Sequence, residues 1–134
     1  MIFLDGRRAE YWRRVRLQLG QWAVQDLNVL DVACGFGKFA DVFVPLNYVG
    51  IDFSDEMIAL AKKEKALYHF ERTDVKEWKP PGTFDVIYEI NSLRSLGLTA
   101  DGFVNLFRPY ATMAIATLEA DEFRITQLYP DQRR

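Results

Sequence analysis

The stretch VLDVACGFGKFADVF, residues 29–43, decides the fold of this chain. A short and mostly apolar run, Asn28–Val32, is typical of a buried strand and enters a turn that contains Gly35 and Gly37. Because neither glycine has a Cβ, the backbone can turn tightly there and a ligand can approach it closely. Apolar residues over 39–43 then recur at helical spacing, which predicts a helix whose free N–H groups point at that ligand.

A second apolar run ends in an acid. Residues Tyr48–Ile51 (YVGI) predict a strand that ends at Asp52. A carboxylate in this position can accept hydrogen bonds from both hydroxyls of a ribose, and Phe53, the next residue, can press against a purine ring. The order strand, glycine turn, helix, strand and acid therefore predicts a site for a nucleoside-type cofactor.

The same residues leave a second interpretation open. Gly35, Gly37 and Ala40 also fit the dinucleotide-binding pattern Gly-x-Gly-x-x-Gly/Ala. Two observations count against it. An acid, Asp31, stands inside the first strand just before the turn, and a chain of 134 residues leaves little room for a second mononucleotide half together with a substrate domain.

Outside this stretch, the apolar pattern alternates between helix and strand. The other expected elements are an amphipathic helix over 5–22, a helix that begins at Ser54 and ends near Lys65, a short helix over 101–108 that Pro109 stops, and strands over Leu67–Phe70, Phe84–Tyr88, Thr112–Leu118 and Phe123–Tyr129. This alternation predicts an α/β fold: a Rossmann-like, doubly wound and mostly parallel sheet of five to six strands with helices on both faces. Right-handed crossovers then bring the carboxyl ends of the strands to one edge, where ligands bind.

The glycine turn and its surroundings resemble the class I S-adenosylmethionine-dependent methyltransferases. Residues 29–43 look like the family's first motif, Asp/Glu-x-Gly-x-Gly-x-Gly, and the positions of that motif are occupied by Asp31, Ala33, Gly35 and Gly37. Ala33 stands where Gly is usual, as in the common variant Asp-x-Ala-Cys-Gly-x-Gly. YVGIDFSDEMIALAKKE, residues 48–64, looks like the next motif, in which the resemblance implies that Asp52 holds the ribose and that Phe53 and Met57 flank the adenine.

Two later stretches extend the resemblance over residues ~28–118. RTDVKEW, residues 72–78, resembles the stretch whose Asp meets the adenine amino group while the next backbone N–H meets a ring nitrogen. FDVIYEINSL, residues 84–93, resembles the fourth motif, whose strand end lies beside the methionine part and the substrate. The resemblance implies S-adenosyl-L-methionine as the cofactor. The cofactor-binding residues that it implies are Asp31, Ala33, Cys34, Gly35, Gly37, Asp52, Phe53, Met57, Asp74, Val75 and Glu89.

The chain departs from the family pattern in two places. The family's domain normally has seven strands and ends in an antiparallel hairpin, whereas at most two strands follow Thr112 here. Asn91 is followed by Ser92-Leu93 and not by the Pro-Pro-aromatic sequence of many methylases of base or amide nitrogens, which counts against such a substrate. We expect a single methyltransferase-like domain over 1–134, composed of an N-terminal helix (1–22), a cofactor-binding core (28–118) and an abbreviated C-terminal segment (119–134).

Methyl transfer from a sulfonium is an in-line displacement with an activated leaving group. The protein mainly has to align donor and acceptor and exclude water, and a base is needed only if the acceptor must lose a proton. Glu89 and Asn91, after the fourth strand, and Tyr11, on a first helix that folds over the site as it often does in the family, are the residues expected to act in catalysis.

These observations favour transfer of a methyl group to a small-molecule acceptor. Three alternatives remain: another reaction of the cofactor, such as its breakdown; a non-catalytic, methyltransferase-like subunit completed by a partner; and methylation of RNA by way of an Arg-rich first helix. The acidic pI of about 5.4 counts against RNA. An open sheet edge, left by a missing seventh strand, could pair with a second copy of the chain.

Composition bounds the remaining partners. The chain has 17 Lys and Arg against 19 Asp and Glu, so the net charge is −2, although five Arg against two acids give residues 1–20 a charge of +3. One Cys and one His exclude a disulfide framework and nearly exclude a His/Cys metal cluster, so no metal is expected. Without a run of ~18 apolar residues or a signal peptide at MIFLDGRR, we expect no membrane association and a cytoplasmic location.

Overall fold

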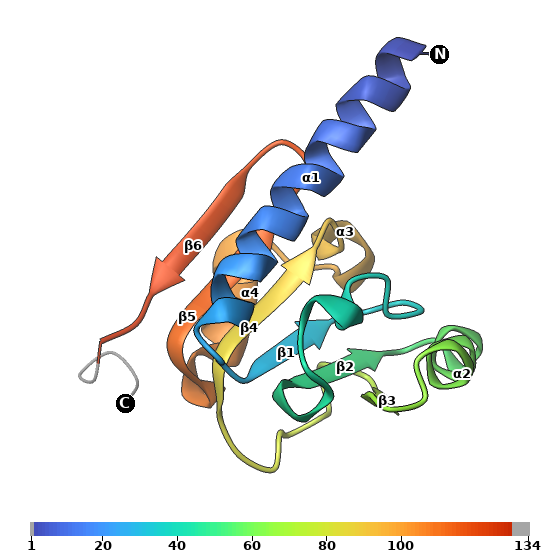
Figure 1. Ribbon diagram of the computed structural model, residues 1–134. Helices are drawn as coiled ribbons and strands as arrows, with labels where there is room; N and C mark the ends of the chain where they lie inside the picture. Colours follow the sequence, from blue (N-terminus) through green and yellow to red (C-terminus); the bar gives the residue numbers. More distant parts are fainter. Residues whose placement is uncertain (1, 130–134) are drawn as a thin grey trace.

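Figure 1 shows a computed structural model in which a twisted six-stranded sheet is covered by helices on both faces; the structure describes residues 2–129. The helices and strands are α1 (Ile2–Val24), β1 (Val29–Val32), β2 (Tyr48–Asp52), α2 (Asp55–Glu64), β3 (His69–Arg72), β4 (Phe84–Ile90), α3 (Leu93–Leu96), α4 (Ala100–Phe107), β5 (Ala111–Leu118) and β6 (Phe123–Gln127). Three short 3-10 turns cover Ala40–Val42, Pro45–Asn47 and Arg108–Tyr110. The expected Rossmann-like, mostly parallel α/β sheet is confirmed.

The strand order is β3-β2-β1-β4-β5-β6. Every neighbouring pair is parallel except β5 and β6, which form an antiparallel hairpin. The chain moves outward from β1 to β3 on one side and from β4 to β6 on the other. The order therefore reverses between β1 and β4, and the crevice outside their carboxyl ends is where a sheet of this kind binds ligands.

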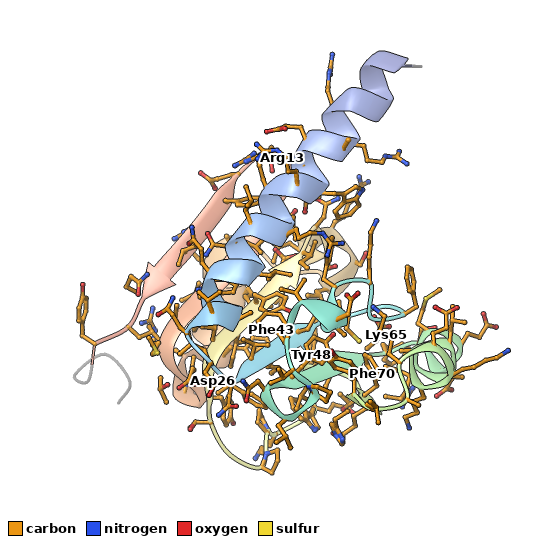
Figure 2. The ribbon with its side chains drawn as sticks, viewed as in Figure 1. Arg13, Asp26, Phe43, Tyr48, Lys65 and Phe70 are labelled. Carbon is orange, nitrogen blue, oxygen red and sulfur yellow. The ribbon has the colours of Figure 1, made fainter. Side chains whose placement is uncertain are left out.

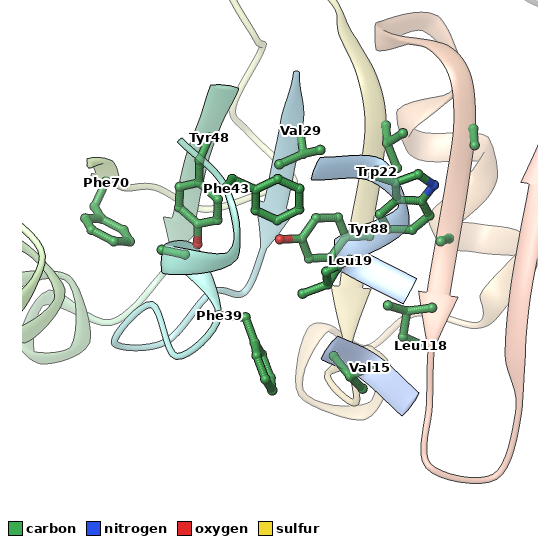
Figure 3. Packing of buried hydrophobic residues seen from close by; sticks show 14 of the residues in the cluster. Val15, Leu19, Trp22, Val29, Phe39, Phe43, Tyr48, Phe70, Tyr88 and Leu118 are labelled. Atoms are coloured by element: carbon green, nitrogen blue, oxygen red, sulfur yellow. The ribbon is translucent and has the colours of Figure 1, made fainter. Parts of the chain in front are cut away.

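The face of the sheet under α1 holds an aromatic core. Val15, Leu19 and Trp22 of α1 are buried, as expected of an amphipathic helix, and the indole of Trp22 stacks on the ring of Tyr88 with centroids 5.7 Å apart (Figure 3). Phe43 and Tyr48 continue this layer toward Phe70 on β3 (Figure 2). Aromatic pairs of this geometry add stabilisation beyond the apolar area they bury.

The opposite face is covered by α4. Phe103, Val104 and Phe107 pack against a cluster that includes Leu30 of β1 and Ile115 of β5. Thr99 caps this helix, because its side-chain oxygen accepts the N–H of Gly102 at 3.0 Å. With apolar layers on both faces, the polar groups at the carboxyl edge of the sheet sit on a rigid base.

One expected helix does not form. Over 39–43 the chain makes only the 3-10 turn Ala40–Val42, after which Phe43 and Val44 are extended. Pro45 follows, and a residue before proline is driven out of the helical region. Phe39 and Phe43 are nevertheless both buried, so the helical spacing of these apolar residues serves packing and not a helix.

Two smaller differences lie near the site. The short helix α3, which the apolar pattern did not predict, follows β4 and ends at Gly97, whose φ of +69° is the left-handed conformation that favours glycine at a helix end. The third strand covers His69–Arg72, later than the expected Leu67–Phe70.

In the part of the chain that the structure describes, no helix combines the length and the apolar character needed to cross a membrane.

Candidate cofactor site

A cavity of about 430 Å³ opens at the carboxyl edge, beside the ends of β1 and β2 and the loop after β3. Its walls are formed by Val32, Ala33, Ile51, Asp52, Phe53, Thr73, Asp74, Val75, Lys76, Ser92, Ser95 and Leu96. Cavities of this size typically hold small ligands. The structure thus brings together five of the residues that were expected to bind the cofactor: Ala33, Asp52, Phe53, Asp74 and Val75.

The turn after β1 needs unusual backbone angles. Gly35 and Gly37 have φ values of +58° and +79°, and Ala33 adopts the same left-handed region with φ +61°. A Cβ on Gly37 would approach the ring of Phe70 to 2.7 Å, closer than real atoms pack. Two constraints therefore favour glycine at Gly37: its left-handed backbone conformation and the space that the Phe70 ring occupies.

Asp52 ties the glycine turn to the start of α2. One carboxylate oxygen of Asp52 accepts the backbone N–H of Gly35 at 2.8 Å, and the other accepts the N–H of Ser54 at 2.9 Å. Ser54 in turn caps α2, as expected, by accepting the N–H of Met57 at 3.2 Å. Each carboxylate oxygen has a further lone pair, so Asp52 can still accept hydrogen bonds from a ligand.

A second, smaller cavity of about 120 Å³ lies between the glycine turn and α1. It is lined by Trp12, Asp31, Ala33, Cys34, Lys38, Phe39 and Ile90, and it shares Ala33 with the larger cavity. The Nζ of Lys38 lies 3.9 Å from the centroid of the Trp12 ring, a cation–π contact that joins the turn to α1. An acid and a base therefore face the same small space.

Asp31 is the buried acid of this smaller cavity. Its side chain is 3% exposed and accepts the hydroxyl of Tyr48 at 2.7 Å. Burial raises the pKa of Asp31 to about 7, the Tyr48 hydrogen bond opposes that rise, and the negative charge of Asp52 adds to it. A cationic group that enters the cavity would therefore stabilise the ionised carboxylate of Asp31.

Glu89 ends the buried part of β4. Its side chain has no exposed surface, its Oε1 accepts the N–H of Ser92, and its Oε2 has no hydrogen-bond donor among residues 2–129. Burial raises the pKa of Glu89 to about 8, as does the adjacent carboxyl of Glu119, while the Ser92 N–H lowers it. Glu89 does not line the larger cavity, but it binds the backbone N–H of Ser92, which does.

Tyr11 and Asn91, the other residues expected in catalysis, converge on one backbone carbonyl. The hydroxyl of Tyr11 donates to the carbonyl oxygen of Leu118, which also accepts the N–H of Asn91 at 3.1 Å. The side-chain oxygen of Asn91 accepts the N–H of Ala120 at 3.3 Å. Both residues therefore fasten the β5–β6 hairpin, and neither lines the two cavities described above.

Two of the expected adenine neighbours lie differently. Phe53 is 62% exposed at the cavity wall, and the guanidinium of Arg72 covers its ring at 4.6 Å. Met57 lies on the exposed side of α2 and is absent from the walls of both cavities. Lys76 and the α3 residues Ser92, Ser95 and Leu96, by contrast, form cavity wall that the motifs did not indicate; only their positions beside Asp74 and Asn91 could have suggested it.

A family model described as a methyltransferase domain matches residues 4–121. The chain therefore belongs to this family of methyltransferase domains. None of the curated proteins matches the chain.

Solved structures of methyltransferases share the fold. One similar structure is DesVI from Streptomyces venezuelae, with 19% identity and a TM-score of 0.63, covering 87% of this chain and 53% of that one. Another is the plantazolicin methyltransferase BpumL with a monoazolic desmethylPZN analog and SAH, with 22% identity and a TM-score of 0.64, covering 84% of this chain and 51% of that one. A third is an S-adenosylmethionine-dependent methyltransferase from Thiobacillus denitrificans with S-adenosyl-L-homocysteine, with 20% identity and a TM-score of 0.61, covering 76% of this chain and 46% of that one. The chain therefore spans about half the length of the solved structures it resembles.

Proposed function

We propose that this chain is an S-adenosyl-L-methionine-dependent methyltransferase that acts on a small-molecule acceptor. The observation that carries the proposal is the pair of cavities that meet at Ala33, at the point where the strand order reverses. Membership of the methyltransferase family supports it, as do similar structures that were solved with S-adenosyl-L-homocysteine.

The larger cavity fits the nucleoside end of the cofactor. We assign the ribose hydroxyls to Asp52, which also holds the glycine turn, and the adenine edge to Asp74 and Val75, which line the same cavity. Phe53 supplies an aromatic surface at the mouth, and Met57 stays a predicted adenine neighbour. Because Gly35 and Gly37 have no Cβ, the cofactor can approach the backbone of the turn closely.

The smaller cavity fits the amino-acid end. A zwitterion carries an ammonium and a carboxylate, and this cavity offers Asp31 to the first and Lys38 to the second. Cys34 lines the same space as a small apolar group. When bound, the cofactor supplies a sulfonium methyl group, and the chain's own contribution is to orient it and to exclude water.

The acceptor would approach from the edge where β4 and β5 end. Glu89, Asn91 and Tyr11 are the residues we assign to this side, where they hold the hairpin and α3 in place. One similar structure, the plantazolicin methyltransferase, was solved with a desmethylPZN analog, which supports a small acceptor for this fold.

The organisation of the chain follows from this assignment. We propose one domain over 1–134, in which residues 28–118 bind the cofactor and residues 1–22 and 119–134 flank it. A homo-oligomer through the outer edge of β6 and a cytoplasmic location stay predictions.

The deciding experiment is calorimetry of the chain with S-adenosylhomocysteine, followed by mass spectrometry after incubation with S-adenosylmethionine alone. Binding without turnover is expected, and acceptor screening then follows. No binding contradicts the proposal. Turnover without an acceptor would favour cofactor breakdown, and binding with no acceptor methylated in a broad screen would favour a non-catalytic subunit.

A further inference from the structure

The carboxyl groups of Glu89 and Glu119 meet at the carboxyl edge of β4 and β5. Glu89 stands in register with Val32 of β1 and Thr117 of β5, and Glu119 follows directly after the end of β5, so both residues lie at the carboxyl edge of the sheet. The two carboxyls accept the backbone N–H groups of the neighbouring residues Ser92 and Leu93, so they converge at the start of α3. Since an ionised carboxylate has no proton to donate, this contact is attractive only when the pair holds one.

The surroundings of the pair favour that shared proton. Glu89 is fully buried, and its Oε2 has no donor in the described part of the chain, which a proton shared with Glu119 would supply. The titratable groups that face it are Glu119 from the β5–β6 hairpin and Tyr11 from α1. Neither is a cation, and no cation contributes to the raised pKa of Glu89.

The pair also holds the start of α3. Glu89 accepts the backbone N–H of Ser92, and Glu119 accepts the N–H of Leu93 at 3.4 Å. The segment that begins there contributes Ser92, Ser95 and Leu96 to the wall of the larger cavity. At its other end, Gly97 packs beside Lys76, which lines the same cavity.

We propose that Glu89 and Glu119 are positioning residues, a proton-sharing carboxyl pair that sets α3 as one wall of the nucleoside cavity. The inference rests on the proposed function, because it treats that cavity as the cofactor site. With one proton between them, the carboxyls attract each other and both backbone N–H groups stay bound. Once both are ionised they repel, Glu119 moves toward water with its hairpin, and the wall loosens.

The first arm of the test uses the ligand-free protein. The amide resonances of Ser92 and Leu93 are followed by NMR between pH 6 and 9, and both are expected to titrate together near the raised pKa of about 8 of Glu89. In Glu89→Gln the amide donates to Glu119 without a proton and its oxygen still accepts from Ser92, so this titration should vanish. Glu122→Gln, an exposed acid of the same hairpin, is the matched control and should titrate as the wild type does.

The second arm measures affinity for S-adenosylhomocysteine by calorimetry at pH 6.5 and pH 9. Between pH 6.5 and pH 9 the wild type and Glu122→Gln should lose roughly 5- to 10-fold more affinity than Glu89→Gln does, because the ionisation of Asp31 and of the ligand affects all three proteins alike. An unchanged pH dependence in Glu89→Gln, or Ser92 and Leu93 amides that do not titrate, would overturn the pair. Titrating amides without any binding at pH 6.5 would instead refute the proposed function, and with it the pair's role at a cofactor site.

Discussion

The carboxylate of Asp52 accepts the backbone N–H of Gly35 at 2.8 Å. The residue that the motif assigns to the ribose is therefore already part of the ligand-free framework, because it fixes the turn after β1 from the end of β2. Binding and stability are linked at this position, so they should change together when it is substituted.

Replacing Asp52 by Ala is expected to lower the free energy of unfolding by about 2 kcal/mol and to weaken S-adenosylhomocysteine binding by about 1–3 kcal/mol, since two backbone N–H groups and the ligand lose a charged acceptor. Urea unfolding and calorimetry measure the two effects. Asp52→Asn, which keeps one acceptor oxygen, should fall between. Glu64→Ala, at the exposed end of α2, should leave binding unchanged; normal binding by Asp52→Ala would refute the ribose assignment.

Ala33 holds a left-handed backbone conformation, with φ +61°, that glycine adopts without steric cost. Ala33→Gly should therefore raise the free energy of unfolding by about 0.5–1 kcal/mol, because the relief of roughly 1–2 kcal/mol exceeds the extra entropy of the unfolded chain. Chemical denaturation measures it. The control Ala40→Gly, at a buried position with no such strain, should destabilise, and destabilisation by both would rule out strain at Ala33.

The two glycines of the turn should respond differently to the same substitution. Both have positive φ, but a new Cβ at Gly37 would meet the Phe70 ring at 2.7 Å, whereas one at Gly35 has no such neighbour within 4 Å. We expect Gly35→Ala to cost about 1 kcal/mol of stability and Gly37→Ala about 2–4 kcal/mol. Phe70→Leu should recover part of the loss only when combined with Gly37→Ala; equal losses for both glycines would contradict the clash.

Stability should fall as the pH rises toward 8. The pKa of Asp31 rises from 3.8 to about 7 and that of Glu89 from 4.5 to about 8, so between these limits the native state holds protons that the unfolded chain has released. The contribution of these bound protons to the free energy of unfolding is complete below about pH 4 and is lost by about pH 8. Above that pH these two groups cause no further change.

Thermal unfolding from pH 5 to 9 tests this dependence. Asp31→Asn, whose side-chain oxygen can still accept from Tyr48, should roughly halve the slope between pH 5 and 7, where Glu89 still contributes, and should leave the slope between pH 7 and 8 unchanged. Asp121→Asn, on the exposed hairpin, should keep the wild-type slope. A wild-type stability that rises over this range would show that neither acid is protonated in the native state.

Lys38 should distinguish the two ends of the cofactor. If it binds the carboxylate of the amino-acid end, Lys38→Ala should weaken S-adenosylhomocysteine binding by about 5- to 10-fold, the loss of one charge-assisted contact. Adenosine, which lacks that end, should bind the variant and the wild type equally. Calorimetry with both ligands decides it, and Lys62→Ala on the exposed surface of α2 is the control. An equal loss for adenosine would move Lys38 to the nucleoside end.

The strands and the turn after β1 were predictable because their signals are local. Alternating apolar runs, the glycines of the turn and the acid at the end of β2 each act within a few residues, and the structure places them as expected. The helix over 39–43 was wrong because Pro45 and the packing of Phe39 and Phe43 outweigh helical spacing.

The features that the sequence did not reveal depend on register between distant strands. The sequence places Glu89 after the fourth strand and Glu119 after the fifth, but their contact follows only from the pairing of Glu89 with Thr117. The role of α3 as cavity wall likewise depends on where β4 ends relative to β1. Such pairings are long-range properties of the sheet, which single-residue patterns cannot encode.

The Trp12 indole, at 3.9 Å from the Lys38 ammonium, lines the smaller cavity, while Trp22 lies in the core against Tyr88. Trp12 is thereby an intrinsic fluorophore at one end of the candidate site, and its emission depends on a cation and on water that an incoming ligand must rearrange. Filling that end should shift the fluorescence spectrum without any attached dye. With the signals of Trp22 and Trp78 removed by substitution to Phe, Trp12 is thus an optical reporter for the smaller cavity.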